Sequence, residues 1–353
     1  MMKKLTENDK SFFWVAFKLG IGALVYRGAI ELLSYVMLAL LGIITARDPE
    51  NIVLYNSMNY LLSGMVSVAS FLLAAITLWI ILRVGKHRDY KPTLWSPRIT
   101  IFAPFLIIAT VALNFAMAEI NSLAISLLAP NVSMYITTTP TEITAIEIIL
   151  MLISTAVIPG IVEEIMFRGI MLTNLMPYGK GMAIVCSAFL FGLMHMNPSQ
   201  FFYTTLMGLV LGYIYVRTKS IWICMIIHFV NNALGVLQQI FYQCNEMAVA
   251  DELMSQLMLT VMILGIISMG VLLIARAVKR KKAPEEVGSF GCTYEPCLSY
   301  EARSITKSKK ILLFFSPSIS LFTVIVFASM IMTMVSVFLV GLLMGIFPGM
   351  FTL

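Results

Sequence analysis

The chain has 353 residues, of which 59% are hydrophobic and only 12% are charged, and its mean hydropathy is +0.92. Soluble domains are about 45–50% apolar and about 25% charged, so this composition excludes an ordinary water-soluble globule and a disordered chain. The net charge of +6 comes from basic residues beside apolar segments, not from a separate polar face, so we expect no nucleic-acid partner.

Apolar segments long enough to cross a bilayer recur along the chain, because a helix needs about 20 residues to span a hydrocarbon core of about 30 Å. The sequence therefore predicts an all-α, polytopic transmembrane bundle of about nine spans. Before the first span, residues 12–27 are expected to form an amphipathic lead-in in which Arg27 can pair with Glu31 one turn later. The last span contains Pro317 and Gly341, which leave a broken helix or a re-entrant pair open. The expected spans are residues 28–46, 59–83, 100–129, 144–167, 182–198, 200–216, 221–243, 252–277 and 311–345.

The positions of lysine and arginine predict the orientation, since cytoplasmic loops retain these residues. Three of the 24 basic residues (Lys18, Arg27 and Arg168) lie within helical segments. With nine alternating spans, all of the others except Arg47 fall on one side. We therefore expect a multi-pass protein of the cell membrane with a cytoplasmic N-terminus and an external C-terminus.

Four parts are expected along the chain. Residues 1–97 hold the lead-in and two transmembrane helices, and residues 98–277 form a core whose motifs lie within 144–240. Residues 278–310 are the only long polar stretch and read as a cytoplasmic linker, and residues 311–353 form a C-terminal transmembrane segment. His87 lies in a basic stretch beside a span and is assigned no role in a site.

Ionisable side chains in the spans are informative, because each costs on the order of 2.5–3.5 kcal/mol at mid-bilayer on insertion scales. Glu164 and Arg168 are four residues apart with the acid first, which favours an ion pair within the helix and predicts a supporting structural role for both. Glu163 is rotated by about 100° from Glu164, so it must face other helices or water. Pro159 and Gly160, one turn earlier, are expected to loosen this helix and admit water.

Three further polar residues lie in other spans. His195 is near the end of one span, and His228 and Asn232 share one face of another. Their convergence with Glu163 would support hydrolysis of a peptide bond. A carboxylate in an apolar pocket can take a proton from water and return it to a leaving amine, and His195 can orient the same water. His228 and Asn232 suit an oxyanion hole as hydrogen-bond donors.

These residues form three recognisable motifs. EEIMFRG at 163–169 resembles EExxxR, FGLMH at 191–195 resembles FxxxH, and HFVNN at 228–232 resembles HxxxN. Their order and spacing resemble those of the CPBP (CAAX protease and bacteriocin-processing, or Abi) family of intramembrane proteases. The resemblance implies a conical intramembrane catalytic cavity in the central helices and a CAAX-type endopeptidase. It makes Glu163 and His195 the activators of water, His228 and Asn232 the oxyanion stabilisers, and Glu164 and Arg168 supporting residues.

Other functions stay open at this point. Glu163, His195 and His228 could instead bind zinc, the pattern of a metalloprotease, although the preferred mechanism needs no cofactor. A non-proteolytic bacteriocin-immunity or membrane scaffold protein is an alternative from another class. The expected partners are membrane lipid and a peptide or lipidated-protein substrate, and nothing in the sequence identifies that substrate.

Overall fold

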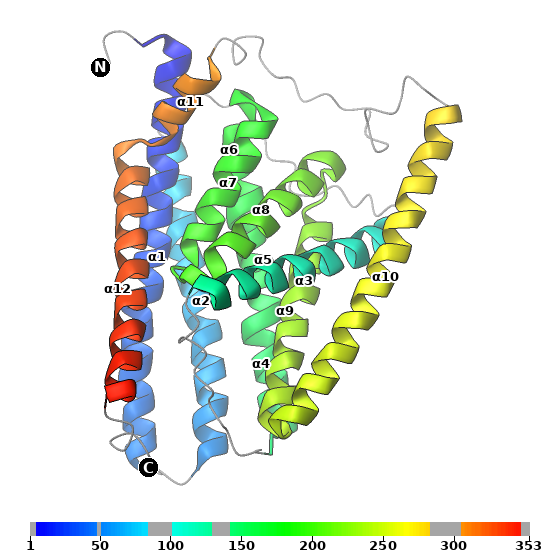
Figure 1. The fold of residues 1–353 in the computed structure, drawn as a ribbon. Coiled ribbons are helices and arrows are strands. Elements are labelled where there is room, and N and C mark those ends of the chain that lie inside the picture. The colour runs from blue at the N-terminus through cyan, green and yellow to red at the C-terminus, as the bar shows by residue number, and fades with distance from the viewer. Residues whose placement is uncertain (1–4, 48–50, 84–100, 129–141, 283–304, 347–353) are drawn as a thin grey trace.

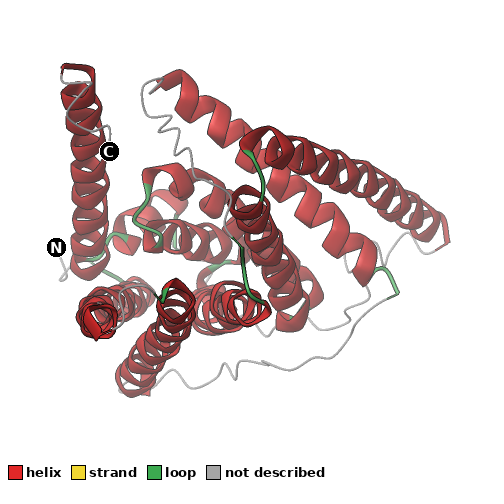
Figure 2. Ribbon diagram, turned by 90° about the horizontal axis from the view of Figure 1, so that it is seen from below, coloured by secondary structure: helices red, strands yellow, loops and turns green. Residues whose placement is uncertain are grey.

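The computed structural model describes residues 5–47, 51–83, 101–128, 142–282 and 305–346 (Figure 1). All elements in these ranges are helices and none is a strand, so the predicted all-α fold is confirmed (Figure 2). His87 lies outside the described residues. The elements are α1 (Glu7–Arg47), α2 (Ile52–Arg83), α3 (Ala103–Leu128), α4 (Ala145–Leu152), η3 (Ile153–Val157), α5 (Ile158–Glu164), η4 (Ile165–Leu172), α6 (Thr173–Leu175), η5 (Met176–Tyr178), α7 (Lys180–Met194), α8 (Pro198–Thr218), α9 (Ile221–Cys244), α10 (Met247–Lys282), α11 (Lys307–Phe314) and α12 (Pro317–Ile346).

All nine predicted segments are helical, and seven stretches of the described chain are long and apolar enough to cross a membrane. The two predicted spans that fall outside this set, 182–198 and 200–216, correspond to α7 and α8. With 15 residues, α7 is about 22 Å long, which is short of a core of about 30 Å. Figure 1 shows α7 and α8 together in the upper part of the molecule. The chain is thus a multi-pass membrane protein, and an odd number of spans keeps the predicted orientation of the termini unchanged.

The lead-in and the first span form a single helix, α1, of 41 residues. The predicted lead-in at 12–27 is therefore continuous with the first span. Phe12, Ala16 and Leu19 are fully buried in the bundle, which explains why the helix continues through this region. The predicted ion pair between Arg27 and Glu31 is present.

The last span packs against the first half of α1, and the two helices lie side by side in Figure 1. The Ser318 hydroxyl donates a hydrogen bond to the Phe17 carbonyl at 2.6 Å, and Lys309 forms an ion pair with buried Asp9. Gly20 permits this approach, because a Cβ there would lie 2.4 Å from Ser318 Oγ. The span itself is one unbroken helix, and the break falls before it, between α11 and α12. The polar linker at 283–304 lies outside the described residues.

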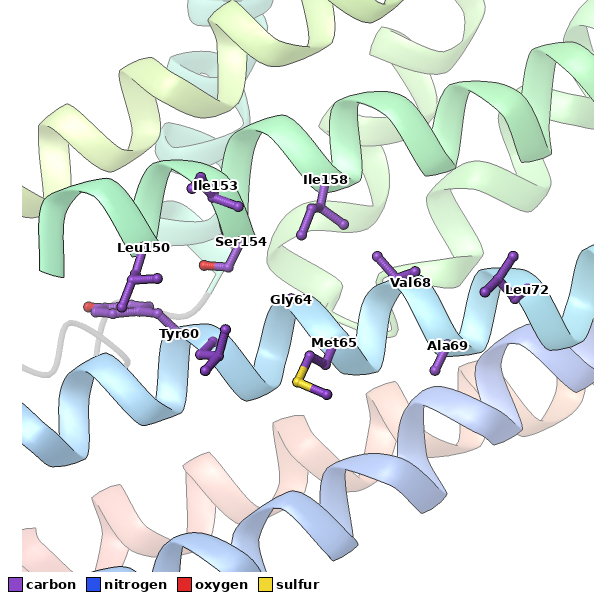
Figure 3. A pocket seen from close by; sticks show the side chains of 11 residues that line it. Tyr60, Gly64, Met65, Val68, Ala69, Leu72, Leu150, Ile153, Ser154 and Ile158 are labelled. Atoms are coloured by element: carbon purple, nitrogen blue, oxygen red, sulfur yellow. The ribbon is translucent and has the colours of Figure 1, made fainter. Parts of the chain in front are cut away.

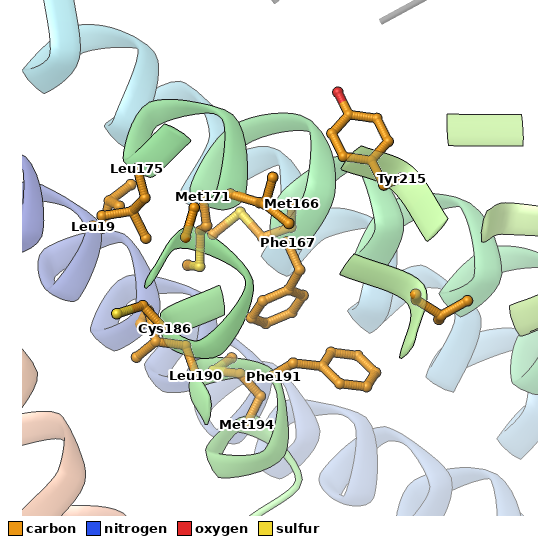
Figure 4. Close-up of a cluster of buried hydrophobic side chains, with 14 of the residues drawn as sticks. Leu19, Met166, Phe167, Met171, Leu175, Cys186, Leu190, Phe191, Met194 and Tyr215 are labelled. Atoms are coloured by element: carbon orange, nitrogen blue, oxygen red, sulfur yellow. The ribbon is translucent and has the colours of Figure 1, made fainter. Parts of the chain in front are cut away.

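Buried side chains of α1, η4, α7 and α8 form the core beside the predicted site (Figure 4). Phe167 and Phe191 meet edge to face at its centre, with ring centroids 5.1 Å apart. Such aromatic pairs add stabilisation beyond the area that they bury. This core fixes the helix end that carries His195 against the helix that carries both glutamates.

The span from Ala145 to Tyr178 contains two π-helical segments. The π-helical segments η3 and η4 flank α5, which carries Glu163 and Glu164. Such segments are frequent at functional sites because they re-aim the side chains that follow. Gly160 lets α5 approach α9 closely, since a Cβ there would lie 3.2 Å from the Phe229 backbone nitrogen.

Replacing Gly160 with alanine is therefore expected to destabilise the protein, although alanine favours a helix over glycine by up to about 1 kcal/mol. The added methyl group must push α9 away. Gly270→Ala in α10 is the matched control, because no described heavy atom lies within 4 Å of its Cβ position. Thermal unfolding in detergent should show a lower midpoint for Gly160→Ala and an equal or higher midpoint for Gly270→Ala. Equal midpoints for both variants would contradict the close-contact argument.

Candidate active site

The six residues singled out by the motifs come from four parts of the chain. Glu163 and Glu164 lie on α5, Arg168 on η4, and His228 and Asn232 on α9, while His195 directly follows the last residue of α7. The structure brings the three motifs together, as their chemistry requires.

Glu164 is the hub of a buried polar network. Its Oε1 accepts a hydrogen bond from Arg168 at 2.7 Å and another from His228 Nδ1 at 2.8 Å. Arg168 also donates to the Gly208 carbonyl at 3.3 Å, which ties in α8. The Glu164 side chain is fully buried, so its negative charge depends on these donors. The predicted ion pair is confirmed, and its link to His228 is an addition that spacing within one helix cannot show.

Glu163 has a different environment. Its side chain is 23% exposed, whereas that of Glu164 is 0% exposed. Glu163 Oε2 lies 3.8 Å from His228 Nε2, so the two groups face each other without a direct hydrogen bond. Glu163 also interacts electrostatically with His195, and His195 with His228. The carboxylate and both imidazoles therefore share one site.

The two histidines are oriented by different acceptors. His195 Nδ1 lies 3.0 Å from the Phe191 carbonyl oxygen, and His228 Nδ1 bonds to the Glu164 carboxylate. Both acceptors can only accept, so each Nδ1 carries a hydrogen and each Nε2 is left for the chemistry. A carboxylate also stabilises a positively charged imidazole, which a neutral carbonyl does to a much smaller degree.

Phe191, the first residue of the FxxxH motif, packs against both histidines. Its ring meets the His195 ring edge to face at 5.1 Å and the His228 ring at 5.8 Å. The Arg168 guanidinium lies 4.7 Å from the same ring. A cation over an aromatic face is attracted electrostatically. This phenylalanine therefore positions the site residues around it.

Asn232 is oriented by a hydrogen bond to a carbonyl that Pro159 leaves without its helical donor. Pro159 has no backbone N–H to donate to Thr155, four residues earlier, so the Thr155 carbonyl lacks its α-helical donor. Asn232 Nδ2 donates to this carbonyl at 3.1 Å. The predicted loosening of the helix at Pro159 thus has a specific result, which is to hold the Asn232 amide at the Thr155 carbonyl.

Three aromatic or basic residues near the site have no place in the motifs. Tyr26 and Tyr203 interact electrostatically with Glu163, and Tyr203 also bonds to Asn231. Arg27 of α1 donates to the Met194 carbonyl at 3.3 Å. Tyr26 and Arg27 lie far from the motifs along the chain, although an arginine in an apolar helix is itself a signal, and Tyr203 lies between two motifs in a segment rich in aromatic residues.

An apolar groove lies on the other side of η3, between α2 and the α4–α5 stretch (Figure 3). Its volume is about 330 Å³, and Tyr60, Gly64 and Ser154 are among its lining residues. Ser154 directly precedes Thr155, so the groove and Asn232 flank the same π-helical segment. This groove is separate from the predicted catalytic cavity, which stays a prediction.

The zinc alternative, with Glu163, His195 and His228 as ligands, stays untested. Within the described ranges no group of three or more His, Cys, Asp or Glu residues could hold a metal ion. The predicted ligands Glu163, His195 and His228 do not form such a group. Glu164, the carboxylate left to act as the base in that alternative, is already bonded to Arg168 and His228.

Residues 145–234 match the family described as type II CAAX prenyl endopeptidase Rce1-like. The Bacillus subtilis (strain 168) protein YdiL, which its name describes as a candidate membrane peptidase, is 33% identical to this chain over 94 residues. That match covers 26% of this chain and spans 38% of the length of YdiL. None of the solved structures matches. The segment that contains all six site residues is therefore similar to this family, which supports the resemblance seen in the motifs.

The buried network predicts a large effect of Arg168→Met. Removing one partner of a buried ion pair costs about 3–5 kcal/mol, because the other charge stays buried. Arg217→Met is the control. This arginine stacks on Tyr213 at the end of α8, so its loss should cost at most about 1 kcal/mol.

Chemical unfolding in detergent measures both free energies. The double variant Glu164→Gln with Arg168→Met should be more stable than the sum of the two single losses predicts, because neither charge is then left alone. Strictly additive losses would contradict a coupled pair.

Proposed function

We propose that the protein is an intramembrane endopeptidase of the CAAX type that hydrolyses a peptide bond in a membrane-associated substrate. The observation that carries this proposal is the approach of Glu163 to His228 Nε2 at 3.8 Å, with His195 in electrostatic interaction with both and Asn232 four residues after His228 on α9. The proposed substrate is a CAAX-like, prenylated or leader-bearing chain. Membrane lipid surrounds the enzyme as its second partner.

In the proposed reaction Glu163 takes a proton from water, and the resulting hydroxide attacks the carbonyl carbon of the scissile bond. The tetrahedral intermediate then collapses. Its C–N bond breaks, Glu163 returns the proton to the leaving amine, and a new carboxyl terminus is released. The partial exposure of Glu163 lets water reach it, whereas Glu164 is sealed off.

The two histidines have complementary roles in this mechanism. His195 faces the reacting water with Nε2 as an acceptor, because its Nδ1 hydrogen is held by the Phe191 carbonyl. His228 donates from Nε2 in its doubly protonated form, and Glu164 stabilises that positive charge. Asn232 supplies a second donor to the oxyanion.

The charges of the site support this assignment. Glu163, Glu164, Arg168 and a protonated His228 together sum to zero, so the buried cluster needs no further counter-ion. Charges within a bilayer are tolerated when they pair in this way. When Glu163 takes the proton from water, its negative charge passes to the oxyanion, where His228 and Asn232 can receive it.

The deciding experiment compares the membrane proteomes of cells that express the wild type, Glu163→Gln or Glu252→Gln. Glu252 is an exposed carboxylate on α10 and serves as the matched control. Peptides with new C-termini should appear with the wild type and with Glu252→Gln and should be absent with Glu163→Gln. The same peptides, made chemically and incubated with purified enzyme in lipid vesicles, give kcat and KM.

Two results would contradict the proposal. Cleavage that is unchanged in Glu163→Gln removes the proposed base, and an immunity phenotype that survives the same substitution favours a binding protein without peptidase activity. A stoichiometric zinc content, with loss of activity in 1,10-phenanthroline and rescue by zinc, would instead favour the metalloprotease mechanism.

Pro159→Ala should lower kcat while leaving the protein equally or more stable. Alanine restores an N–H donor for the Thr155 carbonyl, and this donor competes with Asn232. Loss of one oxyanion donor costs up to about 100- to 1,000-fold in kcat, and a misplaced donor should cost at least about tenfold. Pro198→Ala at the start of α8, where proline interrupts no helical bond, is the control. Wild-type kcat in Pro159→Ala would show that the proline does not orient Asn232.

A further inference from the structure

The first helix reaches the candidate active site although it lies far outside the matched segment at 145–234. Arg27, at the middle of α1, donates from one guanidinium nitrogen to the Met194 carbonyl at 3.3 Å. The other guanidinium nitrogen pairs with Glu31 on the same helix. Met194 is the last residue of α7 and directly precedes His195.

The end of α7 needs an external restraint. The last carbonyls of a helix have no partner within it and carry its partial negative charge. A guanidinium at Met194 satisfies one of these carbonyls with a charged donor. Arg27 also interacts electrostatically with His195 itself.

The turn that follows is strained. Met196 has a φ of 48°, in the left-handed region that residues other than glycine rarely adopt. His195 therefore sits between the last turn of α7 and a residue in an unfavourable conformation. Strained backbone of this kind persists only where its surroundings hold it in place.

We infer that Arg27 is a positioning residue of the active site, which holds the end of α7 so that the His195 imidazole faces Glu163. The inference rests on the proposed function and adds to it a contribution from α1. Leu19, on the same helix, packs into the core next to η4 and α7. The Ser11 and Tyr178 hydroxyls are hydrogen-bonded at 2.7 Å, and Ser318 of α12 donates to the Phe17 carbonyl in the same half of α1. The arginine is thus presented from a helix that is itself fixed.

Two substitutions of Arg27 test this role. Arg27→Met removes the donor, and Arg27→Lys keeps a cation that can still reach a carbonyl. A misplacement of about 1 Å can cost on the order of 100-fold in rate. We therefore expect kcat for Glu163-dependent cleavage to fall about 10- to 100-fold in Arg27→Met, with KM within about twofold of the wild type. Arg27→Lys should recover a large part of the loss.

Glu31→Gln is the matched control. It removes the ion pair within α1 but leaves the bond from Arg27 to Met194 intact. We expect its kcat to stay within about twofold of the wild type. Hydrogen exchange gives a readout that does not depend on activity: backbone amides at 192–197 should exchange faster in Arg27→Met and at the wild-type rate in Glu31→Gln.

The inference is overturned if Arg27→Met keeps the wild-type kcat, or if Glu31→Gln loses as much activity as Arg27→Met. It is also overturned if KM rises while kcat is unchanged, because that result would assign Arg27 to substrate binding. If Arg27→Met does not fold, Arg27→Gln takes its place beside Glu31→Gln, and kcat and exchange rates in Arg27→Gln equal to those of the wild type overturn the inference. The proposed function fails separately, when Glu163→Gln cleaves like the wild type.

Discussion

The bundle is organised around one carboxylate that has no access to water. Glu164 accepts hydrogen bonds from Arg168 on its own span and from His228 on α9, while Arg168 continues to the backbone of α8. A charge in this position is costly unless each donor is in place. The three helical segments that carry these groups are therefore held in one arrangement. This arrangement leaves the neighbouring Glu163 facing the second nitrogen of His228.

The division of work between two adjacent glutamates follows from the geometry of a helix. Successive side chains differ by about 100° in direction, so one carboxylate can be enclosed while the next reaches a wetter space. The enclosed Glu164 is hydrogen-bonded to Arg168 and His228, and the partly exposed Glu163 is the base in the proposed mechanism. The two histidines show the same principle through their acceptors, since His228 bonds to a carboxylate and His195 to a carbonyl.

The sequence predicted the helical class, the nine helical segments and the pairing of Glu164 with Arg168, because each depends on hydropathy or on spacing within one helix. It also singled out His195, His228 and Asn232, since polar groups in apolar segments are rare. It could not predict that Glu164 binds His228 or that Phe191 packs against both imidazoles. Those contacts depend on how the helices cross. Gly160 permits the close crossing of α5 and α9, and the hydrophobic periodicity of the sequence does not predict such a backbone contact. The sequence also could not show that the lead-in packs against α12, because that helix lies far away along the chain.

The contacts that α1 makes with α11 and α12 can form only after the ribosome has synthesised those two helices. Asp9 and Lys309 are 300 residues apart, so at about 5–20 residues per second the lysine is synthesised roughly 15–60 s after the acid that it neutralises. During that interval α1 lies in the membrane without α12 beside it. The nascent bundle therefore gains this contact only after α11 has been synthesised, and a message cut short upstream of α11 yields a chain in which Asp9 lacks its partner.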